Sequence, residues 1–236
     1  DLLMSRYKDV LQEEGLDQLQ RMQAAARRMQ QMVEALLYLS RITTHARPFQ
    51  LTDLNKIAAE VLEDLGLLIE RTQGRVEVDE LPTILADPDQ MRQLFANLIS
   101  NALKYHRPGV SPLVKVVVAH PSENKIIPLS LGEYSSRPAT LNENEWVADK
   151  VLILFIDNGI GFDMKDLGKI FQPFQRLVGR SEYEGVGIGL AICRKIVERH
   201  GGHLTAYSQV GQGSTFMLTL PRQAADQVAT GGSEYP

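Results

Sequence analysis

Cysteine is nearly missing from this sequence: Cys193 is the only one among 236 residues. A single cysteine excludes an internal disulfide framework and is typical of a protein in a reducing compartment. We therefore expect a cytoplasmic protein.

Several other features are missing as well. The sequence has no run of about 18 apolar residues, which predicts that no segment spans a membrane, and its start does not resemble a signal peptide. A net charge of −4 without a long basic run gives no indication of a nucleic-acid partner. The sequence begins with Asp1 and an apolar stretch rather than with Met, so we expect it to be a fragment of a longer protein.

The hydrophobic content is sufficient for a folded protein. Hydrophobic residues make up 44% of the sequence, enough for one substantial core and a smaller unit. We predict a helical hairpin at residues 1–47, a globular domain at 48–222 and a disordered, polar tail at 223–236. Within the domain, residues 120–149 are rich in Pro, Ser and Asn and are predicted to form a long, partly mobile hairpin insertion.

The N-terminal part carries a heptad pattern. Apolar residues alternate spacings of three and four over about three repeats, at Leu19, Met22, Ala26, Met29, Val33, Leu36 and Ser40. We expect residues 13–15 to form a turn and this helix to be the second of a hairpin. Two helices cannot cover so wide an apolar stripe, which predicts a homodimer that completes a four-helix bundle. The alternative is that the hairpin packs on its own globular domain.

The rest of the sequence mixes helices with short strands. Asp87-Pro88-Asp89-Gln90 is a strong helix opening, because it offers an N-cap acceptor, a proline at the first helical position and a glutamine that completes a capping box. We predict an α+β sandwich, with helices on one face of a mixed, mostly antiparallel sheet. The expected helices are 54–68, 88–105 and 189–200, and the expected strands are 75–78, 83–86, 114–119, 151–156, 203–207 and 215–220.

The stretch 93–105 is the first candidate for chemistry. Apolar side chains recur every four residues on one face of this helix, whereas Asn97, Asn101 and Lys104 share another face. Two amides and an ammonium offer oxygens to a hard cation and donors to a phosphate. The plain alternative is an amphipathic helix with a polar outer face.

Two glycine-rich motifs follow. Asp157-Asn158-Gly159-Ile160-Gly161 comes directly after an apolar strand, where a carboxylate can accept a hydrogen bond from an exocyclic amine and the backbone can approach a flat ring. The alternative is a common Asp-Asn-Gly turn. Gly185-Val186-Gly187-Ile188-Gly189-Leu190 runs into a helix, where backbone N–H groups favour a polyphosphate. The second motif is not a P-loop, because no Gly-Lys-Ser/Thr follows.

Two further segments complete the set. Phe171-Gln172-Pro173-Phe174 lies between the glycine motifs, and we expect it to belong to a mobile flap with aromatic anchors. Gly211-Gln212-Gly213-Ser214-Thr215-Phe216 is predicted to be a turn that enters the last strand.

Taken together and in this order, the motifs resemble the catalytic, ATP-binding domain of two-component sensor histidine kinases over residues 87–221. The stretch 97–105 is similar to the family's N box, 157–161 to its G1 box, 171–174 to its F box and 185–190 to its G2 box. The helix that ends at residues 36–41 is similar to the second helix of the family's dimerisation and phosphotransfer domain. The resemblance implies the GHKL, or Bergerat, ATP-binding fold.

The resemblance also implies a kinase that uses ATP and Mg²⁺. Asn97 and Lys104 would act near the phosphates, Asn101 would supply an oxygen to Mg²⁺, and Asp157 would read the adenine amino group. The other implied nucleotide-binding residues are Tyr105, Gly159, Gly161, Phe174, Gly185, Gly187, Gly189, Leu190 and Thr215. The implied partners are a second copy of the chain, the receiver domain of a response regulator and a sensor domain upstream in the same chain.

One departure concerns the phosphoacceptor histidine of this family. That residue lies on the first helix of the hairpin, just before acidic and proline residues. None of the five histidines has this setting; they are His45, His106, His120, His200 and His203. We therefore expect the acceptor upstream of Asp1, so that the fragment binds ATP but does not phosphorylate itself on that residue.

Three other functions compete with this one. Gyrase-type, mismatch-repair and chaperone ATPases place a glutamate general base where this sequence has Asn97, and an amide cannot take a proton from water. Protein serine kinases of the same superfamily lack so clear a dimerisation hairpin. A catalytically inactive scaffold would dimerise and dock a receiver domain, but the complete N, G1 and G2 residues argue against it.

Overall fold

The computed structural model describes residues 13–44, 47–119, 128–130, 133–134, 150–177 and 186–222. The chain forms two compact units, Asp1–Arg41 and Ile42–Pro236. The predicted boundary near residue 47 stays a prediction, and both the first helix of the predicted hairpin and the tail at 223–236 lie outside the described residues. Within the described ranges, no helix is long and apolar enough to cross a membrane.

The first unit is described by one long helix. Helix α2 (Glu13–Thr44) includes the residues expected to form a turn at 13–15, so that expectation is wrong. A single glycine costs a helix only about 1 kcal/mol relative to alanine, so this stretch stays helical. Met22, Met29 and Val33 of the heptad pattern are between 55% and 67% exposed. An apolar stripe along this helix is therefore open to solvent in the single chain.

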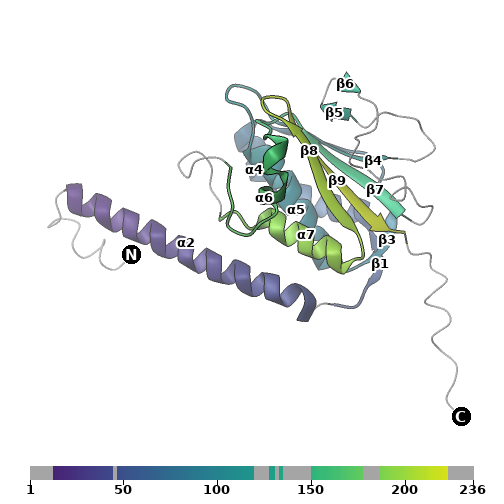
Figure 1. Ribbon diagram of the computed structural model, residues 1–236, viewed down its shortest axis with the longest axis horizontal. Helices are drawn as coiled ribbons and strands as arrows, with labels where there is room; N and C mark the ends of the chain where they lie inside the picture. Colours follow the sequence, from purple (N-terminus) through teal and green to yellow (C-terminus); the bar gives the residue numbers. More distant parts are fainter. Residues whose placement is uncertain are drawn as a thin grey trace, which may run out of the picture. The chain divides into compact units, whose positions relative to one another are not determined.

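The second unit is built on a five-stranded sheet (Figure 1). The strands follow the order β2–β4–β7–β9–β8, and only the β2–β4 pair is parallel. Their bounds are β2 Arg75–Val78, β4 Leu113–Ala119, β7 Lys150–Asp157, β8 His203–Gln209 and β9 Gly213–Pro221. The predicted α+β class with a mixed, mostly antiparallel sheet is confirmed.

Helices α5 (Pro88–Lys104) and α7 (Gly189–Arg199) lie on one face of this sheet (Figure 1). The single helix expected at 54–68 is instead two helices, α3 (Leu54–Asp64) and α4 (Gly66–Thr72). The break comes at Leu65, directly before a glycine, whose backbone freedom disfavours an unbroken helix. The remaining described elements are β1 Gln50–Asp53, β3 Thr83–Ala86, β5 Pro128–Ser130, β6 Glu133–Tyr134, η2 Met164–Asp166 and α6 Leu167–Ile170.

Helix α5 begins with the N-cap and the proline that its sequence predicts, but the predicted capping box does not form, because the Asp87 N–H donates to His200 Nε2 and Gln90 Nε2 donates to the Ile42 carbonyl. The Asp87 side chain accepts a hydrogen bond from the Gln90 N–H at 3.3 Å, and Pro88 occupies the first helical turn. The apolar face of the helix is buried, and the Phe95 ring meets the Phe155 ring of β7 edge-on, with centroids 5.1 Å apart. This contact fixes α5 on the sheet.

Strand β7 is central, and every residue after Lys150 is buried. Side chains alternate between the faces of a strand, so Phe155 and Asp157 both project to the helix side. Leu152, Leu154 and Ile156 project to the opposite face, where they pack with Met217 of β9. The apolar pattern of β7 therefore brings Asp157 out at the strand end, on the side of the helices.

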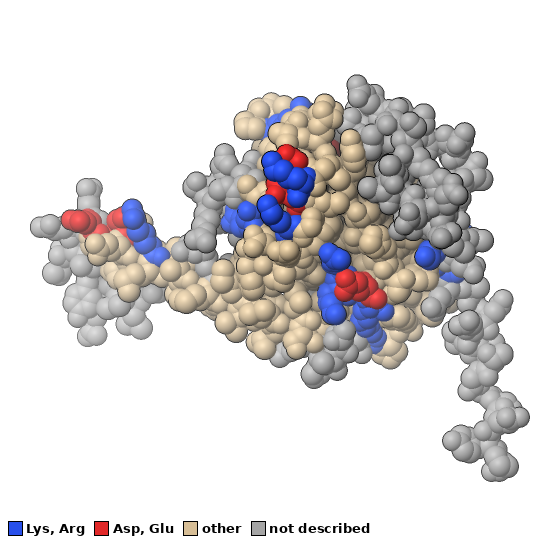
Figure 2. Space-filling model, in the orientation of Figure 1, with Lys and Arg blue, Asp and Glu red and all other residues tan. Residues whose placement is uncertain are grey.

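The surface charges visible in Figure 2 lie in small groups of both signs. Ion pairs also form at η2 and α6, where Lys165 Nζ lies 2.8 Å from Asp163 Oδ2 and Lys169 Nζ lies 2.7 Å from Asp166 Oδ1. The described part of this unit thus carries local ion pairs on a mixed surface.

Candidate nucleotide-binding site

Asp157 is a buried carboxylate with one oxygen already engaged. Its Oδ1 accepts hydrogen bonds from the Gly159 N–H at 2.8 Å and the Ser214 N–H at 3.2 Å. Burial raises the pKa of this carboxyl to about 6, against the lowering effect of these two donors. Oδ2 accepts no hydrogen bond from a described residue and can receive one from a ligand.

The G1-box glycines are packed against protein backbone. A Cβ on Gly159 would lie 2.4 Å from the carbonyl oxygen of Tyr105, and one on Gly161 would lie 2.0 Å from that of Gln209. The Ile160 N–H also donates to the Tyr105 carbonyl, at 2.9 Å. These positions need glycine because the end of α5 and the end of β8 approach the loop so closely. The expectation that the G1-box backbone also approaches the flat ring of a ligand stays a prediction.

The strand register separates Thr215 from Asp157. Ser214 is paired with Asp157 across β7 and β9, whereas Thr215 is paired with Ile156. Paired residues project to the same face, so Thr215 lies on the face opposite the helices. The Ser214 hydroxyl is buried and lies 3.0 Å from that of Ser208. Ser214, which the sequence analysis did not assign to the site, thus lies beside Asp157, and the role of Thr215 towards the nucleotide stays a prediction.

Asn97 joins the N box to the G2 box. Its Nδ2 donates to the Gly189 carbonyl at 3.4 Å, and its Oδ1 accepts from Gln93 Nε2 at 3.2 Å. Gly189 is the first residue of α7, and Ile188 before it makes no side-chain cap. The N–H groups of the first turn of a helix are natural partners for an anion. Asn97 therefore lies beside a place where phosphate groups are favoured.

The other N-box residues follow along α5. Asn101 and Lys104 are both half-buried, as is Tyr105 just beyond the helix. Among the described residues, no cluster of three His, Cys, Asp or Glu side chains could hold a metal. A divalent cation here would therefore depend on amide oxygen, such as that of Asn101, and on oxygens of the ligand itself.

The F box touches the G2 box. The Phe174 N–H donates to the Gly187 carbonyl at 2.8 Å, and a Cβ on Gly187 would lie 2.8 Å from the carbonyl oxygen of Gln175. Phe171 is buried, whereas Phe174 is 38% exposed. Leu190 is half-buried in the first turn of α7, and Gly185 lies outside the described residues. The structure thus links N to G1, N to G2, and F to G2.

A pair of glycine substitutions tests how tightly the G1 loop is held. Gly161 has a φ of +62° and Gly109 a φ of +73°, but only Gly161 has backbone atoms in the way of a Cβ. Gly109→Ala should cost about 1–2 kcal/mol for its positive φ alone. Gly161→Ala should cost roughly 1–3 kcal/mol more because the crowding atom is backbone, and it should abolish ATP binding. Chemical unfolding and ATP titration of both variants measure this; equal losses would contradict the packing described for the loop.

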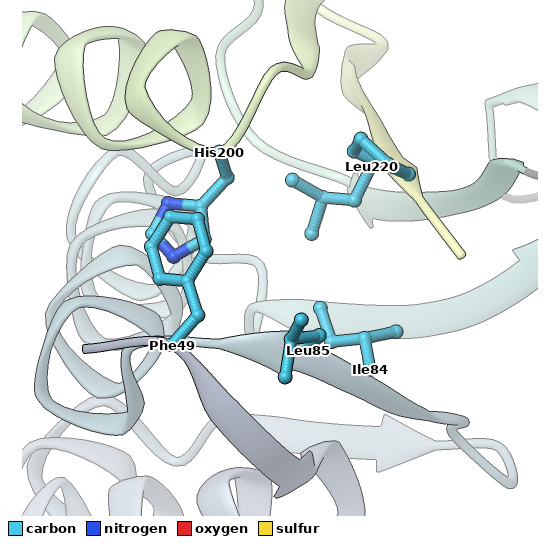
Figure 3. Close-up of a pocket in the computed structure, with 6 residues that line it drawn as sticks. Phe49, Ile84, Leu85, His200 and Leu220 are labelled. Carbon is cyan, nitrogen blue, oxygen red and sulfur yellow. The ribbon is translucent and has the colours of Figure 1, made fainter. Parts of the chain in front are cut away.

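A small pocket lies elsewhere, between β1, β3, β9 and the end of α7 (Figure 3). Phe49 stacks on His200 there, with ring centroids 4.5 Å apart. His200 Nε2 accepts from the Asp87 N–H at 3.1 Å, and its Nδ1 lies 2.8 Å from the Ile196 carbonyl. Both nitrogens are used by a neutral ring, and burial lowers its pKa. The pocket is a packing feature, since none of the predicted site residues lines it.

Sequence comparison identifies close relatives. The chain is 36% identical over 220 residues to cyanobacterial phytochrome A of Nostoc sp., a match that covers 93% of this chain and 25% of the phytochrome. It is 34% identical over 176 residues to the adaptive-response sensory kinase SasA of Prochlorococcus marinus, covering 73% of this chain and 40% of SasA. The chain thus spans about a quarter of the length of the phytochrome and less than half of SasA.

Comparison of structures gives the same fold. The catalytic domain of histidine kinase ThkA matches with a TM-score of 0.54 and 22% identity, over 75% of this chain and 97% of that domain. The family model for histidine kinase-, DNA gyrase B-, and HSP90-like ATPases matches residues 86–224, more than half of the chain. The chain therefore belongs to this ATPase family, and its globular unit is an ATPase domain of the kind found in histidine kinases.

Proposed function

We propose that the chain is the kinase core of a sensor histidine kinase. It transfers the γ-phosphate of ATP to a histidine upstream of Asp1, and from there to an aspartate of a response regulator. The observation that carries this proposal is Asn97, held 3.4 Å from the first residue of α7, beside the favoured phosphate position. An amide there can bind and orient phosphate but cannot activate water, which favours transfer over hydrolysis.

The site offers a separate group for each end of ATP. Asp157 Oδ2 accepts from the adenine amino group, while the first turn of α7, Asn97 and Lys104 bind the phosphates. Asn101 holds Mg²⁺, which neutralises phosphate charge when it is bound. Tyr105, Phe174, Leu190 and the glycines of the G1 and G2 boxes complete the contacts with the nucleotide.

The positions of the histidines support an acceptor outside this sequence. His200 is 6% exposed and has both ring nitrogens engaged, and His203 begins strand β8 in the sheet. His106 lies in the loop just after α5, and His45 and His120 lie outside the described residues. No described histidine is on α2, the element on which phosphotransfer is proposed to depend.

The exposed stripe of α2 supports a homodimer. Leu36 and Leu37 are each 50% exposed in the single chain, as part of a face that is apolar along the helix. A second copy would bury this face in a four-helix bundle. The same helices would then present the acceptor histidine to a receiver domain, under control of a sensor domain upstream in the chain. ATP and a reduced cysteine suit a cytoplasmic site of action.

Transfer of label from γ-labelled ATP tests the proposal. We expect label on a version of the protein extended upstream through the preceding helix, and none on the present chain. The label should be stable in base and lost in acid, as a phosphohistidine is. Label on the present chain would place the acceptor inside it and contradict the assignment of the five histidines.

The same assay separates the alternatives. Acid-stable label would indicate a protein serine kinase. Release of free phosphate without labelled protein would indicate an ATPase of the gyrase or chaperone type. A chain that binds no Mg·ATP would be a catalytically inactive dimerisation and docking scaffold.

A further inference from the structure

Arg107 lies in the loop after α5 and joins two other loops of the site. Its Nε donates to the Asn158 carbonyl at 2.9 Å, and its Nη1 donates to the Gly211 carbonyl at 3.1 Å. Because the guanidinium donors form a rigid planar fork, one side chain holds both carbonyls at a set separation. None of the four family motifs includes this residue.

One carbonyl belongs to the loop that follows Asp157, and the other to a turn that packs against this loop. Asn158 is the next residue in the chain, and Gly211 lies in the turn that connects β8 and β9. The Gly211 N–H donates to the Ile160 carbonyl at 2.7 Å. At Gly213 this turn passes so close that an added Cβ would lie 1.9 Å from the Asp157 carbonyl oxygen. A shift of either segment would therefore shift the carboxylate.

The Asn158 side chain also anchors the loop that follows Asp157. Its Oδ1 accepts from the Leu113 N–H at 2.8 Å, and its Nδ2 donates to the Ser111 carbonyl at 3.1 Å. The segment 105–113 thus makes hydrogen bonds to both the side chain and the carbonyl of Asn158, the latter through Arg107. A rotation of Asn158 would therefore break the hydrogen bonds of its side chain and of its carbonyl.

We propose that Arg107 is a positioning residue that aims Asp157 Oδ2 at the 6-amino group of adenine. This inference rests on the proposed function, because it needs ATP in the site. Arg107 makes no contact with the nucleotide in this role. Its loss leaves the phosphate contacts of α5 and α7 in place and loosens recognition of the base.

The test compares ATP with purine riboside 5′-triphosphate, which lacks the 6-amino group. The wild-type protein should bind ATP about 10–100-fold more tightly, the factor for one hydrogen bond to a charged acceptor. Arg107→Ala should weaken ATP binding roughly tenfold and leave the analogue nearly unchanged, so that the ratio of the two dissociation constants falls towards one. Arg107→Lys keeps one donor and should restore part of the ratio.

Arg75→Ala is the matched control, since the exposed Arg75 side chain on β2 forms an ion pair with Glu77, at 2.9 Å, and with no other residue that the structure describes. It should keep the wild-type ratio. An Arg107→Ala protein that binds both nucleotides equally less well, or binds both normally, would overturn the inference. If Arg107→Ala does not fold, Arg107→Lys decides: a wild-type ratio overturns the inference and a reduced ratio supports it. A wild-type protein that binds neither nucleotide would instead overturn the proposed function itself.

Discussion

Replacing Asp157 by alanine should abolish ATP binding and leave dimerisation intact. The variant removes the buried acceptor proposed for the adenine amino group, while α2 as far as Arg41 lies in a different compact unit. Isothermal titration with Mg·ATP and light scattering measure the two properties. Asp163→Ala is a suitable control, because that aspartate is an exposed cap of η2 and should leave ATP binding unchanged. Normal ATP binding by the Asp157→Ala protein would contradict the assignment of Asp157 to the adenine site.

Replacing Asp157 by asparagine tests the role of Oδ2 as an acceptor more specifically. Its oxygen is needed by the Gly159 and Ser214 N–H groups, so its NH₂ group takes the place of Oδ2. A donor would then face the adenine amino group, which is also a donor. We expect Asp157→Asn to fold well and to lose ATP binding as fully as Asp157→Ala.

The asparagine variant should also be more stable than the wild type at neutral pH. The folded protein raises the pKa of Asp157 from 3.8 to about 6, so the unfolded chain loses this proton first. Stability of the ligand-free protein therefore falls as the pH rises from about 4 to about 6, and stays lower above that range. This rise of the pKa corresponds to about 3 kcal/mol of folding free energy lost at neutral pH, and Asp157→Asn should recover it.

Denaturant unfolding of both proteins at pH 4 and pH 8 measures this effect. We expect the stability gain of Asp157→Asn over the wild type to be larger at pH 8 than at pH 4. A variant that is less stable than the wild type at pH 8 would show that ionised Asp157 stabilises the fold, against the cause given for its pKa.

Replacing Asp87 by alanine should give the largest loss of stability. Asp87 is 2% exposed; it caps α5 and lies 3.2 Å from Arg199, whose side chain is only 15% exposed. Its Oδ2 also accepts from the Arg47 N–H at 3.2 Å. The substitution leaves a partly buried guanidinium without its carboxylate and a helix without its cap, for a loss of roughly 3–5 kcal/mol.

Asp53→Ala is the control for the capping part of this effect. Asp53 caps α3 through the Asn55 N–H at 2.8 Å, on the surface of the protein. Its loss should be clearly smaller, as measured by chemical unfolding. A double variant that also carries Arg199→Ala should lose less than the sum of the two single variants, because both break the same contact. Equal losses for Asp87→Ala and Asp53→Ala would mean that the ion pair between Asp87 and Arg199 contributes little.

The sequence by itself determined the local elements and the motifs of this protein. The start of α5 is readable because an N-cap aspartate and a proline act within one helical turn, whereas the capping box expected from the glutamine does not form, because Gln90 contacts Ile42 and Arg199 instead. Strand β7 is readable because a continuous run of apolar residues indicates a central strand, which is buried on both faces of its sheet. The order of the N, G1, F and G2 motifs indicated the ATPase family, since each motif is a short run of adjacent residues.

Only the tertiary structure decided which distant residues meet. Ser214 rather than Thr215 lies beside Asp157, because a register shift of one residue changes the face and no local signal sets it. Arg199 reaches Asp87, and Arg107 reaches Gly211, across more than 100 positions each. Such contacts depend on how helices and turns pack, so the pattern of neighbouring residues does not contain them. The sequence shows the glycines of the G1 box as a motif, but it does not show that the backbone of Tyr105 and Gln209 packs against them.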